Sequence, residues 1–138
     1  MVIERESNPE ESKYVFDQLI RYNARNMPNH IMSNYEQINL ILKDENGEIH
    51  GGILAEWRWN WIHIEILWVD DVLRGQGYGS KLLREVERIA LEKQCECIEL
   101  DTYNFQAPEF YERHGFEVCG VTEYSQGTVK RYYMVKYL

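Results

Sequence analysis

The stretch Val69-Asp70-Asp71-Val72-Leu73-Arg74-Gly75-Gln76-Gly77-Tyr78-Gly79-Ser80 carries three glycines at alternate positions. A strand-like run, Trp61–Val69, precedes these glycines, and an amphipathic segment follows them. Glycines at this spacing let backbone N–H groups converge, because no Cβ atom stands in the way. A helix that begins here adds its own unpaired N–H groups and the positive end of its dipole. The stretch therefore predicts a strand, a glycine-rich turn and a helix that together bind phosphate.

The glycine spacing separates the known kinds of phosphate-binding turn. A Walker loop requires G-x-x-x-x-G-K-[ST], but here Ser80 and Lys81 do not follow the glycines in that order. A dinucleotide-binding turn reads G-x-G-x-x-G, which Gly75, Gly77 and Ser80 approach. That fold needs several βαβ units in succession, and the chain after Ser80 has room for one crossover only. A dinucleotide-binding protein is therefore kept as an alternative.

Two motifs fit a third pattern. Arg74, Gly77 and Gly79 match R-x-x-G-x-G. Further along, Asn104-Phe105-Gln106-Ala107-Pro108-Glu109-Phe110-Tyr111-Glu112-Arg113-His114-Gly115-Phe116 matches N-x-x-A-x-x-F-Y-x-x-x-G-F. Both motifs, in this order and separated by one helix and one strand, resemble the acyl-CoA-binding region of the GNAT superfamily of acetyl-CoA-dependent N-acetyltransferases.

The resemblance implies an α/β (mixed α+β) fold. Its centre would be a GNAT-like mixed sheet with helices on both faces, and acetyl-CoA would lie between two splayed parallel strands. The resemblance is sharp over residues 62–120, and we expect residues 1–138 to form a single N-acetyltransferase domain. Asp71 stands where the family commonly has proline, which should alter the stiffness of the loop more than its chemistry.

Hydrophobic periodicity and turn residues predict the individual elements. The predicted strands cover residues 1–6, 36–43, 49–57, 61–69, 97–103, 116–123 and 131–138. The predicted helices begin at the Asn8 cap, after the glycine turn, and at about residue 107, and residues 28–34 are expected to form a loop. The strands over 61–69 and 97–103 should be parallel, because a helical crossover joins them. The last two strands should form an antiparallel pair.

Composition narrows the range of partners. The net charge of −8 disfavours nucleic acid, which requires clustered Lys and Arg, and mildly favours a cationic acceptor. No apolar run approaches the roughly 18 residues of a membrane span, and no signal peptide is recognisable, so we expect a cytoplasmic protein without a membrane partner. The three cysteines lack C-x-x-C spacing and predict reduced thiols. They and the four histidines offer no ligand pair at the spacing of a metal site, and a homodimer is left open.

Acetyl transfer to an amine requires two proton movements. The alkyl amine, with a pKa near 10.4, must lose a proton before it attacks, and the leaving thiolate, with a pKa near 8.5, must gain one. By resemblance, Tyr111 is the expected general acid; the alternative is a core tyrosine. Glu65, on the central strand, matches the place of a base in several family members, and the alternative is a structural carboxylate. Simple alternation puts His63 on the same face as Glu65, together with Trp61, Leu67 and Val69, so His63 is a rival base.

The resemblance also implies the residues that bind the cofactor. Backbone groups of Leu67, Trp68 and Val69 would pair with the pantetheine arm as an added strand, and one of their N–H groups would polarise the acetyl carbonyl. Asn104 would bind near the sulfur, where Tyr111 also lies; the alternative for Asn104 is a turn residue that closes its strand. The pyrophosphate would contact Arg74, Gly75, Gln76, Gly77, Tyr78, Gly79 and Ser80.

The sequence thus predicts an N-acetyltransferase that uses acetyl-CoA as a cosubstrate, without a metal, to acetylate a primary amine of a small molecule. A peptide or protein amine is the less favoured acceptor. A non-catalytic acyl-CoA-binding module is the first alternative, and a dinucleotide-binding protein is the second.

Overall fold

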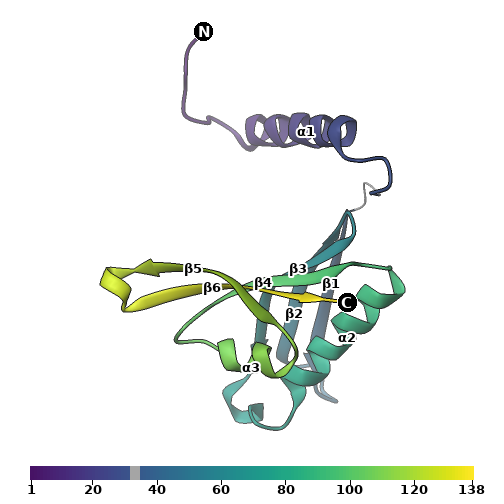
Figure 1. The fold of residues 1–138 in the computed structure, drawn as a ribbon, viewed down its shortest axis with the longest axis vertical. Helices are drawn as coiled ribbons and strands as arrows, with labels where there is room; N and C mark the ends of the chain where they lie inside the picture. The colour runs from purple at the N-terminus through teal and green to yellow at the C-terminus, as the bar shows by residue number, and fades with distance from the viewer. Residues whose placement is uncertain (32–34) are drawn as a thin grey trace. The chain divides into compact units, whose positions relative to one another are not determined.

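The computed structural model describes residues 1–31 and 35–138 and divides the chain into two compact units, Met1–Ser33 and Asn34–Leu138 (Figure 1). The first unit contains helix α1, Pro9–Asn26. The Asn8 side chain caps this helix by accepting the N–H of Glu10 at 3.0 Å, as the sequence predicts. The prediction that helices cover both faces of the sheet stays a prediction.

The flanks of α1 differ in part from the expectation. Residues 1–6 lie outside any strand and are exposed, so the strand predicted there is wrong. Six alternating residues are too short a pattern to distinguish a strand from an extended segment, because a strand also requires a partner. Residues 28–31 form a turn, in which Ile31 donates its N–H to the Pro28 carbonyl at 2.9 Å. Residues 32–34, the end of the predicted loop, lie outside the described residues.

The second unit is built on a six-stranded mixed sheet in the order β1-β2-β3-β4-β6-β5. The strands are β1 (Tyr35–Lys43), β2 (Ile49–Arg58), β3 (Trp61–Val69), β4 (Cys97–Tyr103), β5 (Glu117–Tyr124) and β6 (Val129–Tyr137). β3 and β4 are parallel and the other neighbours are antiparallel, which confirms the predicted crossover and the predicted terminal pair. The predicted mixed α+β class is likewise confirmed.

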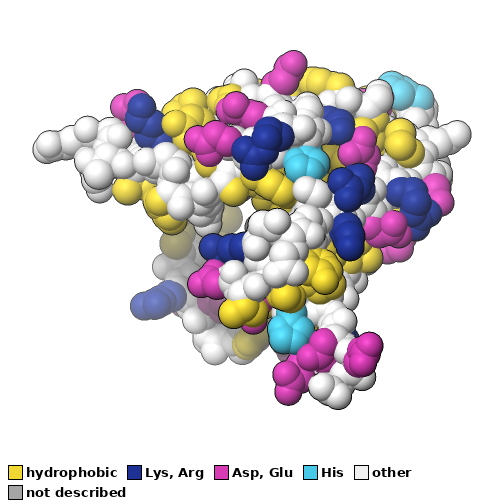
Figure 2. Space-filling view, turned by 90° about the horizontal axis from the view of Figure 1, so that it is seen from below, with side chains coloured by type: hydrophobic (Ala, Val, Ile, Leu, Met, Phe, Trp, Pro, Cys, Tyr) yellow, Lys and Arg dark blue, Asp and Glu magenta, His cyan; other side chains and the backbone are white. Residues whose placement is uncertain are grey.

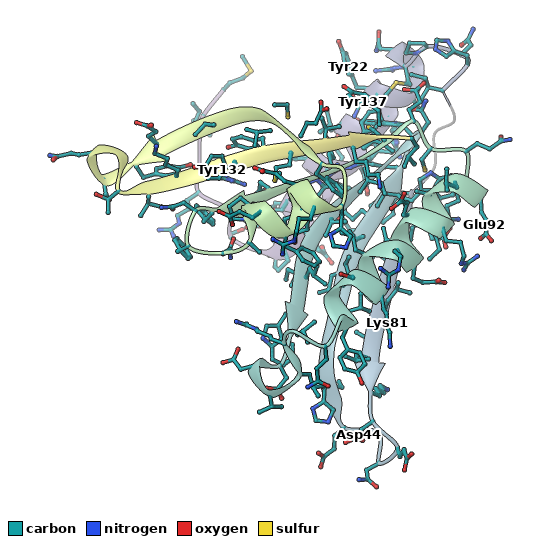
Figure 3. The ribbon with its side chains drawn as sticks, turned by 60° about the horizontal axis from the view of Figure 1, so that its bottom comes forward. Tyr22, Asp44, Lys81, Glu92, Tyr132 and Tyr137 are labelled. Carbon is teal, nitrogen blue, oxygen red and sulfur yellow. The ribbon has the colours of Figure 1, made fainter. Side chains whose placement is uncertain are left out.

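Helix α2, Tyr78–Glu92, provides the crossover between β3 and β4. Its apolar stripe, predicted from the sequence, buries Leu82, Leu83, Val86 and Ala90 against the sheet. Lys81 lies in the first turn of this helix and Glu92 at its last residue, and Asp44 marks the tip of the β1–β2 hairpin (Figure 3). A short helix, α3 (Pro108–Arg113), follows β4, and two 3-10 turns, η1 (Asp71–Leu73) and η2 (Ser125–Gly127), complete the unit. None of the described helices is long and apolar enough to cross a membrane.

Gly51 and Gly52 permit tight packing inside the sheet. A Cβ atom on Gly51 would lie 2.7 Å from the Trp68 carbonyl oxygen, and one on Gly52 would lie 2.8 Å from that of Leu40. The backbones of neighbouring strands therefore approach each other closely at both glycines. The accompanying irregularity falls on the β1–β2 ladder beside Gly51, between Leu42 and Lys43.

Candidate functional site

A cleft opens where β3 and β4 part. Their ladder runs from Trp61–Cys97 to Ile64–Leu100, whereas β3 continues to Val69 and β4 to Tyr103. The cleft has a volume of about 500 Å³. It is lined by Ile64, Glu65, Ile66, Leu67, Trp68, Val69, Arg74, Gly79, Leu100, Asp101, Thr102, Phe105, Gln106, Ala107, Phe110 and Tyr111. The two motifs that are distant in the sequence therefore meet at one cavity, between strands that diverge as expected.

Glu65 lies at a β-bulge. Leu54 of β2 pairs with Ile66, and Ala55 pairs with Ile64, so Glu65 has no partner on β2. Such an extra residue bends the strand and changes the face to which later side chains point. Accordingly, Leu67 and Val69 pack against the hydrophobic core, as Ile64 does before the bulge. The simple alternation that placed Leu67 and Val69 on the face of Glu65 and His63 is therefore wrong beyond the bulge.

The carboxylates of the cleft have different partners. The Asp101 carboxylate accepts a hydrogen bond from Arg131 Nε at 2.9 Å, which balances its charge. Glu65 is exposed and forms no ion pair with the described part of the chain. The rival base, His63, is not a lining residue; its Nδ1 lies 3.4 Å from Glu99 on β4. Glu65 is therefore the better placed of the two predicted bases, although its role stays a prediction.

Tyr111 lies at the inner wall of the cleft. Its ring makes edge-to-face contacts with Phe110 and Phe116, at centroid distances of 5.2 and 5.7 Å. The side chain is 7% exposed, and burial raises the pKa of its phenol to about 12. No hydrogen bond to the hydroxyl is present within the described chain. The phenol is thus held rigidly, remains protonated at neutral pH, and is free to donate its proton to a group in the cleft.

The glycine loop has the geometry expected of a phosphate site. Gly75 and Gly77 have φ angles of +75° and +83°, which only glycine adopts easily, and their Cβ positions face open space. Gly79 has no positive φ angle, and a Cβ atom there would lie 3.4 Å from the Phe110 ring, which is an ordinary van der Waals contact. α2 and α3 therefore pack closely at Gly79.

The first turn of α2 has the features of an anion-binding site. Its N-cap, Gly77, provides no side-chain cap, and no acidic residue lies in the first turn. α1, in contrast, carries the Asn8 cap together with Glu10 and Glu11 in its first turn. Unpaired N–H groups and an uncompensated helix dipole favour a phosphate at α2.

Fixed charges around the loop are mixed. Arg74 lines the cleft, donates from Nε to the Val69 carbonyl at 3.2 Å and pairs with Asp71 at 3.0 Å. It therefore shapes the loop and also brings a positive charge to the cleft. Lys and Arg side chains lie among Asp and Glu side chains on the face seen from below, rather than forming a field of one sign (Figure 2).

The open edge of β3 offers backbone groups to the cleft. Asp70 donates its N–H to the His50 carbonyl of β2 at 2.8 Å. Because successive residues of a strand direct their backbone groups to opposite edges, Val69 and Leu67 direct theirs away from β2. Trp68 lines the same cleft, but this alternation directs its backbone groups toward β2, where it pairs with Gly52. The pairing of all three with pantetheine stays a prediction.

Asn104 is turned toward β6. Its side-chain oxygen accepts the Lys130 N–H at 3.0 Å, and its amide donates to the Thr128 carbonyl at 3.2 Å. Asn104 is absent from the cleft wall, whereas its neighbour Gln106 lines it and accepts the Tyr103 N–H at 2.9 Å. These contacts are those expected of a turn residue that closes its strand, which was the alternative role for Asn104. The predicted contact of Asn104 with the cofactor stays a prediction.

The remaining residues predicted to bind the cofactor lie in the glycine loop and the first turn of α2, beside the cleft; they are Gly75, Gln76, Gly77, Tyr78 and Ser80. Sequence reasoning missed Asp101 and Phe105 as lining residues. Alternation along β4 could have revealed Asp101, because Leu100 and Thr102 on either side are buried. Phe105 carries no comparable signal.

A separate polar group lies at the tip of the β1–β2 hairpin. Asp44, Glu48 and His50 bring potential metal ligands within 4.8 Å of one another. His50 Nε2 lies 2.9 Å from the Asp44 carboxylate, and this hydrogen bond raises the pKa of His50 and lowers that of Asp44. His50 Nδ1 is 3.5 Å from Asp70, which is too long for a good hydrogen bond, so that contact is mainly one of charge. His50 thereby connects the hairpin with the start of the glycine loop.

Comparisons with known proteins agree with this geometry. The model of the acetyltransferase (GNAT) family matches residues 3–116. A blasticidin-S acetyltransferase of Streptomyces morookaense is 39% identical over 85 residues, which are 60% of this chain and 62% of that protein. The chain thus spans less than two thirds of the length of this relative.

Solved structures are also similar. An acetyltransferase from Bacillus cereus ATCC 14579 has a TM-score of 0.90 and 38% identity, and the match covers 100% of this chain and 98% of that one. A Bacillus anthracis str. Ames protein named as a streptothricin acetyltransferase, in complex with acetyl coenzyme A, has a TM-score of 0.65 and 28% identity. That match covers 82% of this chain and 65% of the other.

Proposed function

Because the chain belongs to the acetyltransferase (GNAT) family and is by family an acyltransferase, we propose that it transfers the acetyl group of acetyl-CoA directly to a primary amine of a small molecule. The observation that carries the proposal is the meeting of Glu65 and Tyr111 at the cleft where β3 and β4 part. In this proposal, residues 1–138 act as one N-acetyltransferase domain. The loop after β3 and the uncapped turn of α2 bind the pyrophosphate, with Arg74 beside them.

The open edge of β3 orients the rest of acetyl-CoA. N–H groups of Leu67 and Val69 face the cleft, where they pair with the pantetheine arm and polarise the acetyl carbonyl. The Val69 carbonyl already accepts a hydrogen bond from Arg74, so this acceptor is engaged within the protein, whereas the two N–H groups can donate to the cofactor. Trp68 contributes its side chain to the wall.

Two side chains move the protons. Glu65 accepts a proton from the ammonium group, directly or through water, and the free amine then attacks the thioester carbon. As the carbon–sulfur bond breaks, the electron pair goes to sulfur, which takes the proton of the Tyr111 hydroxyl. The products are an amide and CoA. The nitrogen still carries two protons after the attack and releases one of them to water as the carbon–sulfur bond breaks. Tyr111 recovers its proton from solvent and Glu65 releases its own, so each turnover gives one net proton.

The charge and size of the cleft support a small cationic acceptor. Asp101 is paired with Arg131, so Glu65 remains as the carboxylate available to an incoming ammonium group. A cleft of about 500 Å³ is within the range of small-molecule sites, roughly 300–1,000 Å³. The names of these relatives suggest blasticidin S and streptothricin as the first amines to test.

Release of the CoA thiol, followed across these amines, polyamines, aminoglycosides and peptides, tests the proposal. At least one small amine should support turnover. Tyr111→Phe should lower kcat by on the order of 10²–10⁴ with little change in CoA affinity. Tyr132→Phe, at a partly buried tyrosine outside the cleft, is the matched control and should keep the wild-type rate (Figure 3).

Other outcomes identify the alternatives. CoA binding without thiol release for any amine would indicate a non-catalytic acyl-CoA-binding module. Binding of NAD in place of CoA would indicate a dinucleotide-binding protein. Turnover by Tyr111→Phe within twofold of wild type would return Tyr111 to a purely structural role.

A further inference from the structure

A hydrogen-bonded link joins the first turn of α2 to the end of α3. His114 Nε2 lies 2.9 Å from Ser80 Oγ, although the two residues are 34 positions apart in the sequence. His114 Nδ1 lies 2.7 Å from the Phe110 carbonyl oxygen. A carbonyl can only accept, so Nδ1 must carry the ring proton. In the neutral ring, Nε2 is then the acceptor of the Ser80 hydroxyl proton.

Packing reinforces this link and extends it to Tyr111. The Phe110 ring lies 4.5 Å from the His114 ring, centroid to centroid, and 5.2 Å from the Tyr111 ring. The Phe110 ring edge also approaches the backbone of Gly79, where a Cβ atom would be 3.4 Å away. Contacts therefore run without a gap from the glycine loop, through Phe110 and His114, to the phenol in the cleft.

The proposed chemistry requires a fixed distance between these two ends. The pyrophosphate and the thioester belong to one molecule, so the phosphate-binding turn sets where the sulfur can lie. Tyr111 must be held at a matching place, but it is carried by a helix of six residues. Displacement of a reacting group by about 1 Å can cost roughly 10²-fold in rate.

We propose that His114 is a positioning residue that holds the Tyr111 phenol in register with the phosphate-binding turn through its hydrogen bond to Ser80. The inference rests on the proposed function, because it assumes that Tyr111 protonates the leaving sulfur. His114 itself touches neither the cleft nor the reacting atoms. Its loss should therefore affect kcat through Tyr111 and leave acetyl-CoA binding nearly intact.

Two amide substitutions separate the two hydrogen bonds of His114. The Asn amide can reach the place of Nδ1 and keep the bond to Phe110, but it is too short to reach Ser80. The Gln side chain can reach the place of Nε2 and keep the bond to Ser80. His114→Asn should lower kcat about tenfold, with KM for acetyl-CoA within about threefold of wild type, whereas His114→Gln should keep kcat within about threefold.

The decisive test repeats the same substitutions in the Tyr111→Phe variant. It measures kcat by thiol release from acetyl-CoA, with the best amine of the acceptor screen. His114→Asn should cause no further loss of kcat there, because the group that it positions is gone. Val86→Ala, a buried change on α2 away from this link, controls for general loss of stability and should keep the wild-type kcat.

Three results would overturn the inference. An equal loss of kcat from His114→Asn in both backgrounds would make His114 a general structural residue. Equal kcat in His114→Asn and His114→Gln would mean that the bond to Ser80 does not carry the effect. Full turnover by Tyr111→Phe alone would refute the proposed general acid and this inference with it, and that result is seen before His114 is changed.

Discussion

The burial of Tyr111 has a measurable consequence for stability in alkali. Burial raises the pKa of the phenol to about 12, from 10.0 for a free tyrosine. Below pH 10 the phenol is protonated in the folded and the unfolded chain, so its contribution to stability is fully present. Between pH 10 and pH 12 the unfolded chain releases this proton while the folded chain retains it. The free energy of unfolding therefore falls as the pH rises through this window.

The size of the effect follows from the difference of two pH units. Because one pH unit corresponds to about 1.4 kcal/mol, the full loss, reached above pH 12, is about 3 kcal/mol, and the loss at pH 11 is about 1.4 kcal/mol. Tyr111→Phe removes the titrating group and keeps the ring contacts with Phe110 and Phe116. Since the hydroxyl has no protein partner in the described chain, the substitution should change stability little at pH 8.

Urea unfolding of wild type and Tyr111→Phe at pH 8, 10 and 11 measures this difference. Wild type should lose about 1.4 kcal/mol more than the variant between pH 8 and pH 11. Tyr137→Phe, at a tyrosine that is 75% exposed, is the control and should lose stability in parallel with wild type. Parallel loss in wild type and Tyr111→Phe would refute the reasoning, because burial would then not be what retains the proton.

Three further substitutions test the loop, the base and the hairpin. Gly77→Asp should weaken CoA binding at least about tenfold by calorimetry, because a carboxylate would meet the phosphate at the α2 N-terminus. Gly47→Asp is the control, since Gly47 has the same φ of +83° and open surroundings, and it should keep the CoA affinity of wild type. Equal CoA affinity in wild type and both variants would contradict the phosphate-binding role of the loop. Glu65→Gln should lower the rate at neutral pH and recover partly as alkali deprotonates the amine, whereas an unchanged acidic limb of the pH–rate profile would exclude Glu65 as the base. The pKa of His50 is raised in the folded chain, so the stabilisation from its pairing with Asp44 is complete below pH 6.5 and is lost as the pH rises through the folded-state pKa. His50→Gln should therefore lower the free energy of unfolding more at pH 6 than at pH 8.5. An equal decrease at both pH values, measured by urea unfolding, would argue against the charged bridge to Asp44.

Local chemistry made much of the fold predictable. The Asn8 cap of α1 and the apolar stripe of α2 depend only on residues that are close together in the sequence, so a sequence pattern is enough to identify them. Gly75 and Gly77 are recognisable for the same reason, because their positive φ angles are set inside the loop. The strand expected over residues 1–6 failed because strand formation depends on a partner elsewhere in the chain.

The site was less predictable where partners come from distant residues. Asn104 fits its motif, yet Thr128 and Lys130 supply its hydrogen bonds from 24 and 26 positions further along. Ser80 fits the glycine-loop motif, but its bond to His114 depends on how α2 and α3 pack. A motif specifies residue types, whereas the direction of each side chain depends on contacts that form only in the folded chain.

The bulge at Glu65 shows how one backbone irregularity can serve packing and chemistry together. A strand of regular alternation would place Leu67 and Val69 on the opposite face from Ile64, so all three could not pack on the same core. The extra residue corrects this, since Leu67 and Val69 return to the core face. It also leaves Glu65 without a partner on β2, beside the point where the ladder to β4 ends. The carboxylate is therefore presented to the cleft because the core requires an extra residue there, and the register of β2, rather than any motif around Glu65, determines its position.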